Sequence, residues 1–178
     1  MSIKVAGIFL LAFEVIGNNG STQTIPHRGE QLHFSAEAAS VTRPTSIPQD
    51  VLAILRKDDG VRGALNDEGI QAEQIPASWF SASAIHLGNP NRIDLVVMGE
   101  GPLRGANVIT FWVFQSASRG YALVLTAPAH DLIVMNTRSK GFRDIELVSM
   151  SARQISSVLL RFNGMRYTKH TAKAEAIQ

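Results

Sequence analysis

Histidine and carboxylate side chains are the groups of this sequence that could carry acid–base or metal chemistry. The chain has five histidines, His27, His33, His86, His130 and His170. None has the spacing with which two histidines on one helix or strand face bind zinc. His130 precedes Asp131, and such a pair could act as a general base with its orienting carboxylate. Because neighbours in a strand point to opposite faces, we expect His130 to be an exposed turn residue instead.

A second stretch, HLGNPNRIDLVV (residues 86–97), has the outline of a calcium loop that leads into a strand. It resembles the loop of FG-GAP and VCBS-type repeats, in which Asp-x-Asp-x-Asp-Gly precedes an apolar strand. The aspartate positions of that loop are occupied here by His86, Gly88 and Pro90. Ca²⁺ takes six to eight hard oxygen ligands. Only Asp94 supplies a carboxylate, with Asn89 and Asn91 beside it, so we expect a tight turn without a bound metal.

Two further segments carry residues that could bind an anion. In GPLRGAN (residues 101–107), a glycine-rich loop with Arg104 and Asn107 could present main-chain N–H groups to an anion. It lacks the spacing of a phosphate-binding loop and opens no helix, so we expect a loop between adjacent strands. In TRSKGFRD (residues 137–144), cations crowd a predicted turn and could meet an acidic partner or an anionic polymer. These cations are Arg138, Lys140 and Arg143.

The composition describes a globular chain. It has 178 residues, of which 45% are hydrophobic and 18% are charged, enough for one domain with a sizeable core. The net charge is +2 and no dense basic run is present, which argues against nucleic-acid binding. The absence of cysteine excludes disulfides, thiolate metal sites and a cysteine nucleophile.

The N-terminus has the outline of a signal peptide. Lys4 precedes VAGIFLLAF (residues 5–13), and small and polar residues follow. We interpret residues 1–17 as a signal peptide and expect an exported protein, periplasmic or secreted. The alternative is a buried first strand or helix. The run is too short to span a bilayer as a helix, so we expect no stable membrane insertion after processing.

Two short helices are expected before the strands begin. Ser46 with Gln49 fits a capping box, and apolar residues then recur at helical spacing, which predicts a helix over residues 46–55. The aspartates that follow should end it, and a second helix is expected over residues 61–68. A single weak alternating stretch at residues 32–38 indicates one earlier strand.

Strand-like segments fill the rest of the chain, separated by Gly, Pro, Asn or Ser clusters. They are residues 79–87, 93–99, 108–114, 121–126, 131–136, 142–150 and 155–162. The run VITFWVF (residues 108–114) has almost no polar side, which predicts a central strand buried on both faces. Asn163-Gly164 predicts a two-residue hairpin turn with Phe162 opposite Met165.

We therefore expect a mainly β, α+β fold, an antiparallel meander that is sandwich-like or partly open, with an N-terminal helical element. Residues 18–44 would be a linker, residues 45–170 one β-rich domain and residues 171–178 a tail. The order IPASWF, DLVVMGEGPLRGANVITFWVF, GYALVL, TRSKGFRDIEL and RFNGMRY (residues 75–167) is similar to uncharacterised exported bacterial proteins with a β-rich domain. That resemblance implies export and a β meander, and it brings no activity with it.

The functional expectation is a non-enzymatic exported module that binds a protein or a cell-envelope component. No G-x-S-x-G elbow and no cofactor motif is present, so we expect no cofactor. The alternative is a small hydrolase with a His/Asp site on the sheet loops. Its residues would be His86, Asp94, His130 and Asp131, brought together by folding.

Overall fold

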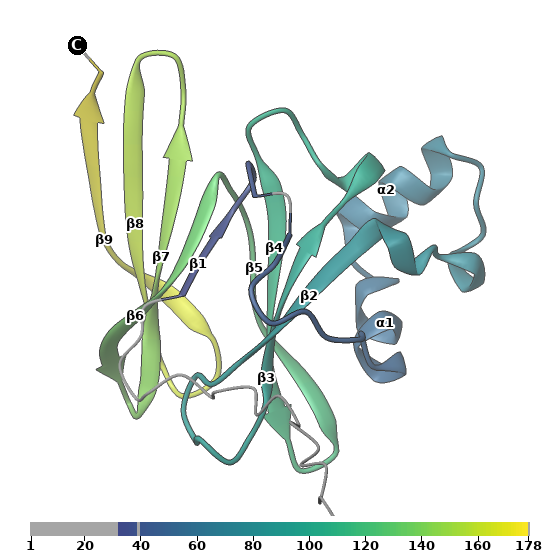
Figure 1. Ribbon diagram of the computed structural model, residues 1–178, viewed down its shortest axis with the longest axis horizontal. Coiled ribbons are helices and arrows are strands. Elements are labelled where there is room, and N and C mark those ends of the chain that lie inside the picture. Colours follow the sequence, from purple (N-terminus) through teal and green to yellow (C-terminus); the bar gives the residue numbers. More distant parts are fainter. Residues whose placement is uncertain (1–31, 39, 178) are drawn as a thin grey trace, which may run out of the picture.

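The computed structural model describes residues 32–38 and 40–177 (Figure 1). The predicted signal peptide, residues 1–17, lies outside the described residues. The described chain folds into two antiparallel sheets with short helices on one side, which confirms the predicted mainly β, antiparallel architecture.

Strands that follow one another along the chain build each sheet. The five-stranded sheet has the order β1 (Leu32–Ser35), β6 (Asp131–Ser139), β7 (Phe142–Met150), β8 (Gln154–Phe162) and β9 (Tyr167–Ala176). The four-stranded sheet has the order β2 (Phe80–Ile85), β3 (Asp94–Gly99), β4 (Ile109–Ala117) and β5 (Gly120–Ala129). Only residue 130 separates β5 from β6, so the chain passes from one sheet to the other at that point.

The two sheets bury their facing side chains against each other. From the four-stranded sheet come Ile85, Val96, Met98, Ile109, Phe111 and Val113, and from the five-stranded sheet Phe34, Leu132, Val134, Ile145, Leu160 and Phe162. Aromatic rings close one end of this core, where the ring centroids of Phe142 and Phe162 lie 4.3 Å apart. The sandwich-like alternative is therefore the one the chain adopts.

The helices α1 (Gln49–Leu55) and α2 (Asp59–Asp67) cover the other face of the four-stranded sheet. Their apolar side chains form a second core with Trp112 and Phe114 of β4. Because Phe111 and Val113 of the same strand face the first core, β4 is buried on both faces, as its apolar sequence predicted. The described residues also form three short 3₁₀ helices, η1 (Ala72–Gln74), η2 (Ala77–Trp79) and η3 (Gly101–Leu103).

The helix ends differ from the sequence prediction. Pro48, rather than Ser46, is the residue at the start of α1, and no side chain caps that end. Asp58 does not end a helix but caps the start of α2, where its Oδ1 accepts the N–H of Gly60 at 3.0 Å and that of Val61 at 3.3 Å. Its Oδ2 accepts the indole N–H of Trp112 at 2.9 Å, which ties the helix to the sheet.

The hairpin between β8 and β9 also differs. Phe162 lies opposite Tyr167, not opposite Met165, so four residues form the connection instead of two. The cause is Asn163, whose side-chain oxygen accepts the N–H of Met165 at 2.9 Å and that of Arg166 at 3.0 Å. This side-chain turn replaces the expected two-residue turn and leaves Met165 80% exposed.

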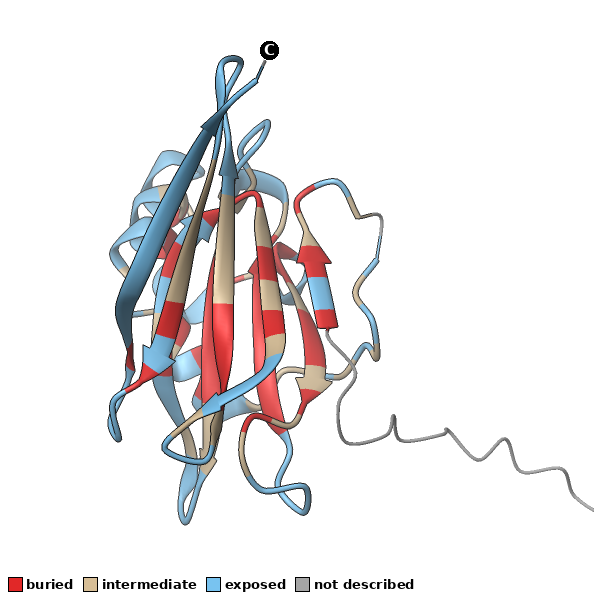
Figure 2. Ribbon diagram, turned by 90° about the vertical axis from the view of Figure 1, so that its left-hand side faces the viewer, coloured by how far each residue is buried: buried red, intermediate tan, exposed pale blue. Residues whose placement is uncertain are grey.

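The ends of β7, β8 and β9 opposite this hairpin extend beyond the core. Strand β9 continues to Ala176, through most of the segment that the sequence assigned to a tail. Figure 2 shows the burial in these three strands confined to one end, with the other end exposed.

Candidate functional site

Four connections between strands gather at one end of the sandwich, which we call the loop end. They are residues 86–93 between β2 and β3, 118–119 between β4 and β5, 140–141 between β6 and β7, and 163–166 between β8 and β9. Figure 1 shows them in the lower half of the view. Polar contacts join them: Arg138 Nη1 donates to the carbonyl of Leu87 at 3.2 Å, and Lys140 Nζ donates to that of Asn163 at 2.6 Å.

Asp94 is the buried anchor of this end. Its Oδ2 accepts the N–H of Leu87 at 2.7 Å, and its Oδ1 accepts the N–H of Ser116 at 2.8 Å. Burial raises the pKa of the Asp94 carboxyl, and these two N–H groups act in the opposite direction. Both oxygens are thus used to hold the 86–93 loop and the end of β4 against β3.

The other residues of the calcium-like stretch shape the loop itself. His86 Nδ1 lies 2.7 Å from the carbonyl oxygen of Arg92, and the Asn89 side chain accepts the N–H of Asn91 at 2.9 Å. Gly88 packs beneath Phe142, where an added Cβ would come within 3.0 Å of the ring. Among the described residues, no group of three or more His, Asp or Glu side chains could hold a metal ion.

The predicted cationic turn is only partly a surface. Arg138 and Lys140 are exposed, but their side chains donate to main-chain carbonyls. Arg143 is 8% exposed, which corrects its expected place at the turn tip. Its Nε donates to the carbonyl of Met135 at 2.7 Å and its Nη2 to that of Val134 at 2.9 Å. A bulge in β6 exposes these carbonyls to the guanidinium, so Arg143 is drawn into the sheet.

Tyr167 completes the buried polar layer under the loop end. Its hydroxyl donates to the carbonyl of Arg143 at 2.6 Å, and burial raises the pKa of the phenol. Next to it in β7, Asp144 is buried, with Oδ2 3.9 Å from Nε of Arg161 and Oδ1 without a hydrogen-bond partner. The Tyr167 hydroxyl thus ties β9 to β7 beneath the loops.

Above this buried polar layer, the loop end exposes apolar tips next to arginines. Ile93 is 52% exposed and follows Arg92, and Met165 is 80% exposed and precedes Arg166. Arg119 is exposed in the β4–β5 connection. The four connecting segments contain no Asp or Glu. None of these residues was a candidate site residue from the sequence, although an apolar residue beside arginine within a turn (NRI, GMR) is a signal for them.

His130 and Asp131 form a second polar cluster, away from the loop end. His130 Nδ1 lies 2.9 Å from Asp131 Oδ1, and His130 Nε2 lies 3.5 Å from Glu37 Oε1. His33 Nε2 lies 3.4 Å from the same oxygen of Asp131. The expectation that His130 is an exposed turn residue is therefore wrong, because it is 6% exposed and pairs with its neighbour.

The position of residue 130 explains the pairing. It lies at the bend between β5 and β6, so the alternation of a regular strand does not apply there. Its N–H donates to the carbonyl of Val148 at 2.8 Å, and its carbonyl accepts the N–H of Ala36 at 2.8 Å. With both ring nitrogens next to carboxylates and the ring buried, this cluster fastens β1 to β6.

The glycine-rich loop before β4 gives no anion site. Arg104 forms an ion pair with Glu100, with Nη1 2.8 Å from Oε2, and it also donates to the carbonyl of Ala36. Asn107 is exposed in the same loop. The segment is a loop between the adjacent strands β3 and β4, as expected, and a neighbouring carboxylate neutralises the arginine charge that could have faced an anion.

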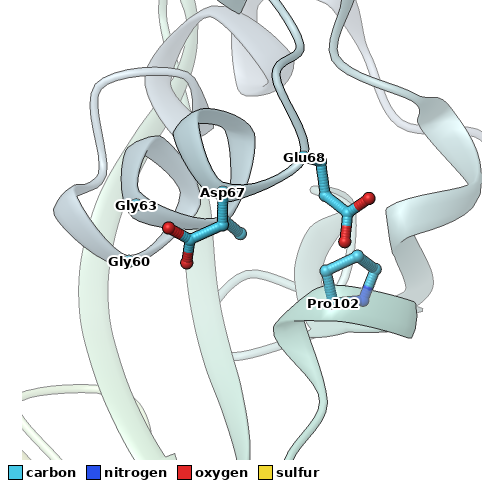
Figure 3. A pocket seen from close by; sticks show the side chains of 6 residues that line it. Gly60, Gly63, Asp67, Glu68 and Pro102 are labelled. Atoms are coloured by element: carbon cyan, nitrogen blue, oxygen red, sulfur yellow. The ribbon is translucent and has the colours of Figure 1, made fainter.

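A pocket lies between α2 and η3, on the helical side of the molecule. Figure 3 shows Asp67, Glu68 and Pro102 at its rim, with Gly60 and Gly63 behind them. The only charged side chains that line it are acidic. It therefore offers nothing to an anionic ligand and no third group for a metal.

Comparison with known proteins returns no relative: no family model, no curated protein and no solved structure matches this chain. Within residues 32–38 and 40–177, neither helix has the length and hydropathy needed to cross a bilayer.

Proposed function

We propose that this chain is an exported, non-enzymatic binding module whose loop end docks on an anionic phospholipid surface of the cell envelope. One observation carries the proposal. At a single end of the sandwich, two exposed apolar side chains, Ile93 and Met165, each lie next to an arginine, in connections free of acidic residues.

Cations outnumber acidic side chains on the exposed surface of the loop end, where the carboxylate of Asp50 contacts the β4–β5 hairpin at the N–H of Tyr121. Five exposed cations belong to this end: Arg92, Arg119, Arg138, Lys140 and Arg166. Each Lys or Arg close to an anionic leaflet contributes about 1 kcal/mol, so together they supply on the order of 5 kcal/mol. That corresponds to a dissociation constant of about 0.2 mM, which means reversible docking and not insertion.

The apolar tips add a second, salt-independent contribution. A methionine side chain that enters the boundary between head groups and acyl chains gains about 1 kcal/mol for partial burial. Met165 is suited to this because hydrogen bonds to Asn163 fix the turn and the buried Phe162–Tyr167 pair fixes its base, with ring centroids 5.5 Å apart. A rigid hairpin loses little conformational entropy when it docks.

Vesicle co-sedimentation of the full chain tests the proposal. Wild type is compared with the double variant Arg92→Gln/Arg166→Gln on vesicles with phosphatidylglycerol and on neutral phosphatidylcholine vesicles. We expect the double variant to lose about 2 kcal/mol on the anionic vesicles, about 30-fold in partitioning. Every variant has the same N-terminal segment, so the difference reports on the loop end alone.

Arg153→Gln is the matched control, because Arg153 is exposed in the connection between β7 and β8 at the opposite end of the sheet. It should bind as wild type does. Soluble polyphosphate is added as a competitor to separate a lipid surface from phosphate chemistry alone. Equal binding of wild type and the double variant would refute the proposal.

The hydrolase alternative has one observation in its favour, the contact between His130 and Asp131. The other two candidate residues lie away from this pair and have other contacts. Asp94 accepts two main-chain N–H groups, and His86 contacts a carbonyl in its own loop. An ester substrate screen with wild type and His130→Gln tests it. Turnover by wild type that His130→Gln abolishes would favour the hydrolase.

A further inference from the structure

Among the described residues, the outer edge of β9 pairs with no strand and could be a template for another. β9 is the last strand of the five-stranded sheet, and no described strand pairs with its second edge. An uncovered edge presents a row of N–H and C=O groups that natural proteins usually protect. Figure 2 shows β9 at the margin of the sheet, exposed beyond its buried first residue.

The other described edges are protected. Residues 43–45 lie along β2, where the N–H of Thr45 donates to the carbonyl of Ala82 at 3.0 Å. β5 contains Pro128, and Asp50 accepts the N–H of its Tyr121 at 3.0 Å. β1 has only four residues. β9 has ten residues, and the second half of its edge carries no such device among the described residues.

Only one half of β9 is regular. The register shifts between Leu159 and Leu160, and Lys169 pairs with Leu160, so its charged side chain lies on the inner face. A bulge and an inward-pointing charge both discourage a new strand along the first half. From Thr171 to Ala176, β9 pairs with β8 without a break.

This regular half is complementary to itself. Alternation places Ala172, Ala174 and Ala176 on one face, with Thr171, Lys173 and Glu175 on the other. We infer that two copies of the chain pair antiparallel through β9, with the two-fold axis at Ala174. Lys173 then lies opposite the partner's Glu175, and Glu175 lies opposite the partner's Lys173.

Charge selects this register over its neighbours. An axis at Lys173 would place that lysine opposite its own copy, and an axis at Glu175 would do the same to the glutamate. An axis at Ala172 would set Glu175 against the partner's Lys169, which lies on the inner face. Opposite charges directly across an antiparallel pair are favourable and like charges are unfavourable, so the axis at Ala174 is preferred.

One exposed apolar side chain adds area to the interface. Ile177 directly follows β9 and is 46% exposed. In the inferred pairing, Ile177 comes opposite the partner's Thr171. The two five-stranded sheets would join into one of ten strands. This inference stands independently of the proposed lipid binding.

A charge swap tests the interface. The full chain is measured by sedimentation equilibrium as wild type, as Lys173→Glu, as Glu175→Lys and as the double variant with both changes. Wild type should be a dimer. Each single variant places like charges across the axis twice and should raise the dimer dissociation constant at least about tenfold. The double variant restores both opposite-charge pairs and should dimerise as wild type does.

The charge swap distinguishes loss of dimerisation from loss of folding. Within one copy, Lys173 pairs with Ser157 and Glu175 pairs with Ile155, so neither has a charged cross-strand partner there. Neither substitution therefore removes a charged cross-strand partner within one copy. A monomeric wild type would overturn the inference. So would a dimer that the single variants leave unchanged, or a double variant that stays monomeric.

Discussion

Replacement of Asp94 by alanine is the perturbation whose magnitude the structure defines best. It leaves the N–H groups of Leu87 and Ser116, now 2.7 and 2.8 Å from carboxylate oxygens, without an acceptor. A buried donor without a partner costs about 1–3 kcal/mol, and removal of a carboxylate that is costly to bury offsets part of two such losses. We expect a net loss of about 3 kcal/mol. For a chain of this size that lowers Tm by about 6–12 °C.

The pH dependence of the same group has a defined sign. Burial raises the folded-state pKa of Asp94 above its ordinary value of 3.8, so the folded protein binds this proton more tightly than the unfolded chain does. The contribution of Asp94 to the free energy of unfolding therefore falls as pH rises from 3.8 through the raised value. Asp94→Asn does not titrate and should lack this component. It should also be destabilised, because its amide N–H₂ faces one of the two donors.

Thermal melts followed by circular dichroism measure both effects, in EDTA and with added Ca²⁺. A Tm of Asp94→Ala within about 2 °C of wild type, less than about 1 kcal/mol, would refute the role of Asp94 as an anchor. A rise in the wild-type Tm with Ca²⁺ would show instead that the carboxylate serves a metal, since a ligand that binds only the folded state stabilises it.

Further outcomes follow from the same contacts. Tyr167→Phe should lose about 1–2 kcal/mol in urea unfolding, because the carbonyl of Arg143 loses its buried donor. The raised pKa of Tyr167 means that the unfolded chain releases the phenol proton first; the wild type should therefore lose stability above pH 10.0, and Tyr167→Phe should lack that component. Met165→Ser should lower vesicle partitioning about fivefold at every salt concentration, whereas the Arg166→Gln effect should shrink as salt rises. Antiparallel dimers direct two loop ends in opposite directions, so wild type should cluster anionic vesicles in a turbidity assay, and Lys173→Glu should not.

Local sequence patterns predicted the elements because their causes are local. The β-branched and aromatic runs gave seven strands at the expected places, and the unbroken apolar run VITFWVF became a strand buried between both cores, like its neighbour β3. Strand β9 was recognised only at its start. Its sequence TKHTAKAEA (168–176) lacks an apolar stripe, and its extended form comes from pairing with β8. From Thr171 to Ala176, alanine alternates with polar residues, but alanine side chains are too small to indicate a buried face.

The candidate residues were predicted less well, because their roles depend on contacts between distant segments. The expectation for His130 failed because the rule of alternating faces holds within a strand, and residue 130 lies where the chain leaves one sheet for the other. Arg143 was expected on a turn tip, yet a bulge in the neighbouring strand turned two carbonyls toward it. Neither cause is visible in the spacing of residues along the chain.

The sequence by itself determined the fold class, the places of seven strands along the chain and the burial of VITFWVF on both faces, since these follow from side-chain periodicity and backbone propensity. Only the tertiary structure decided which residues are available for binding. Asp94 accepts two main-chain N–H groups and Arg143 donates to carbonyls, so neither side chain is available to a ligand. Met165 and the outer edge of β9 are exposed. The physical reason is that hydrogen-bond partners and solvent exposure depend on which segments meet in space, a property that no local pattern encodes.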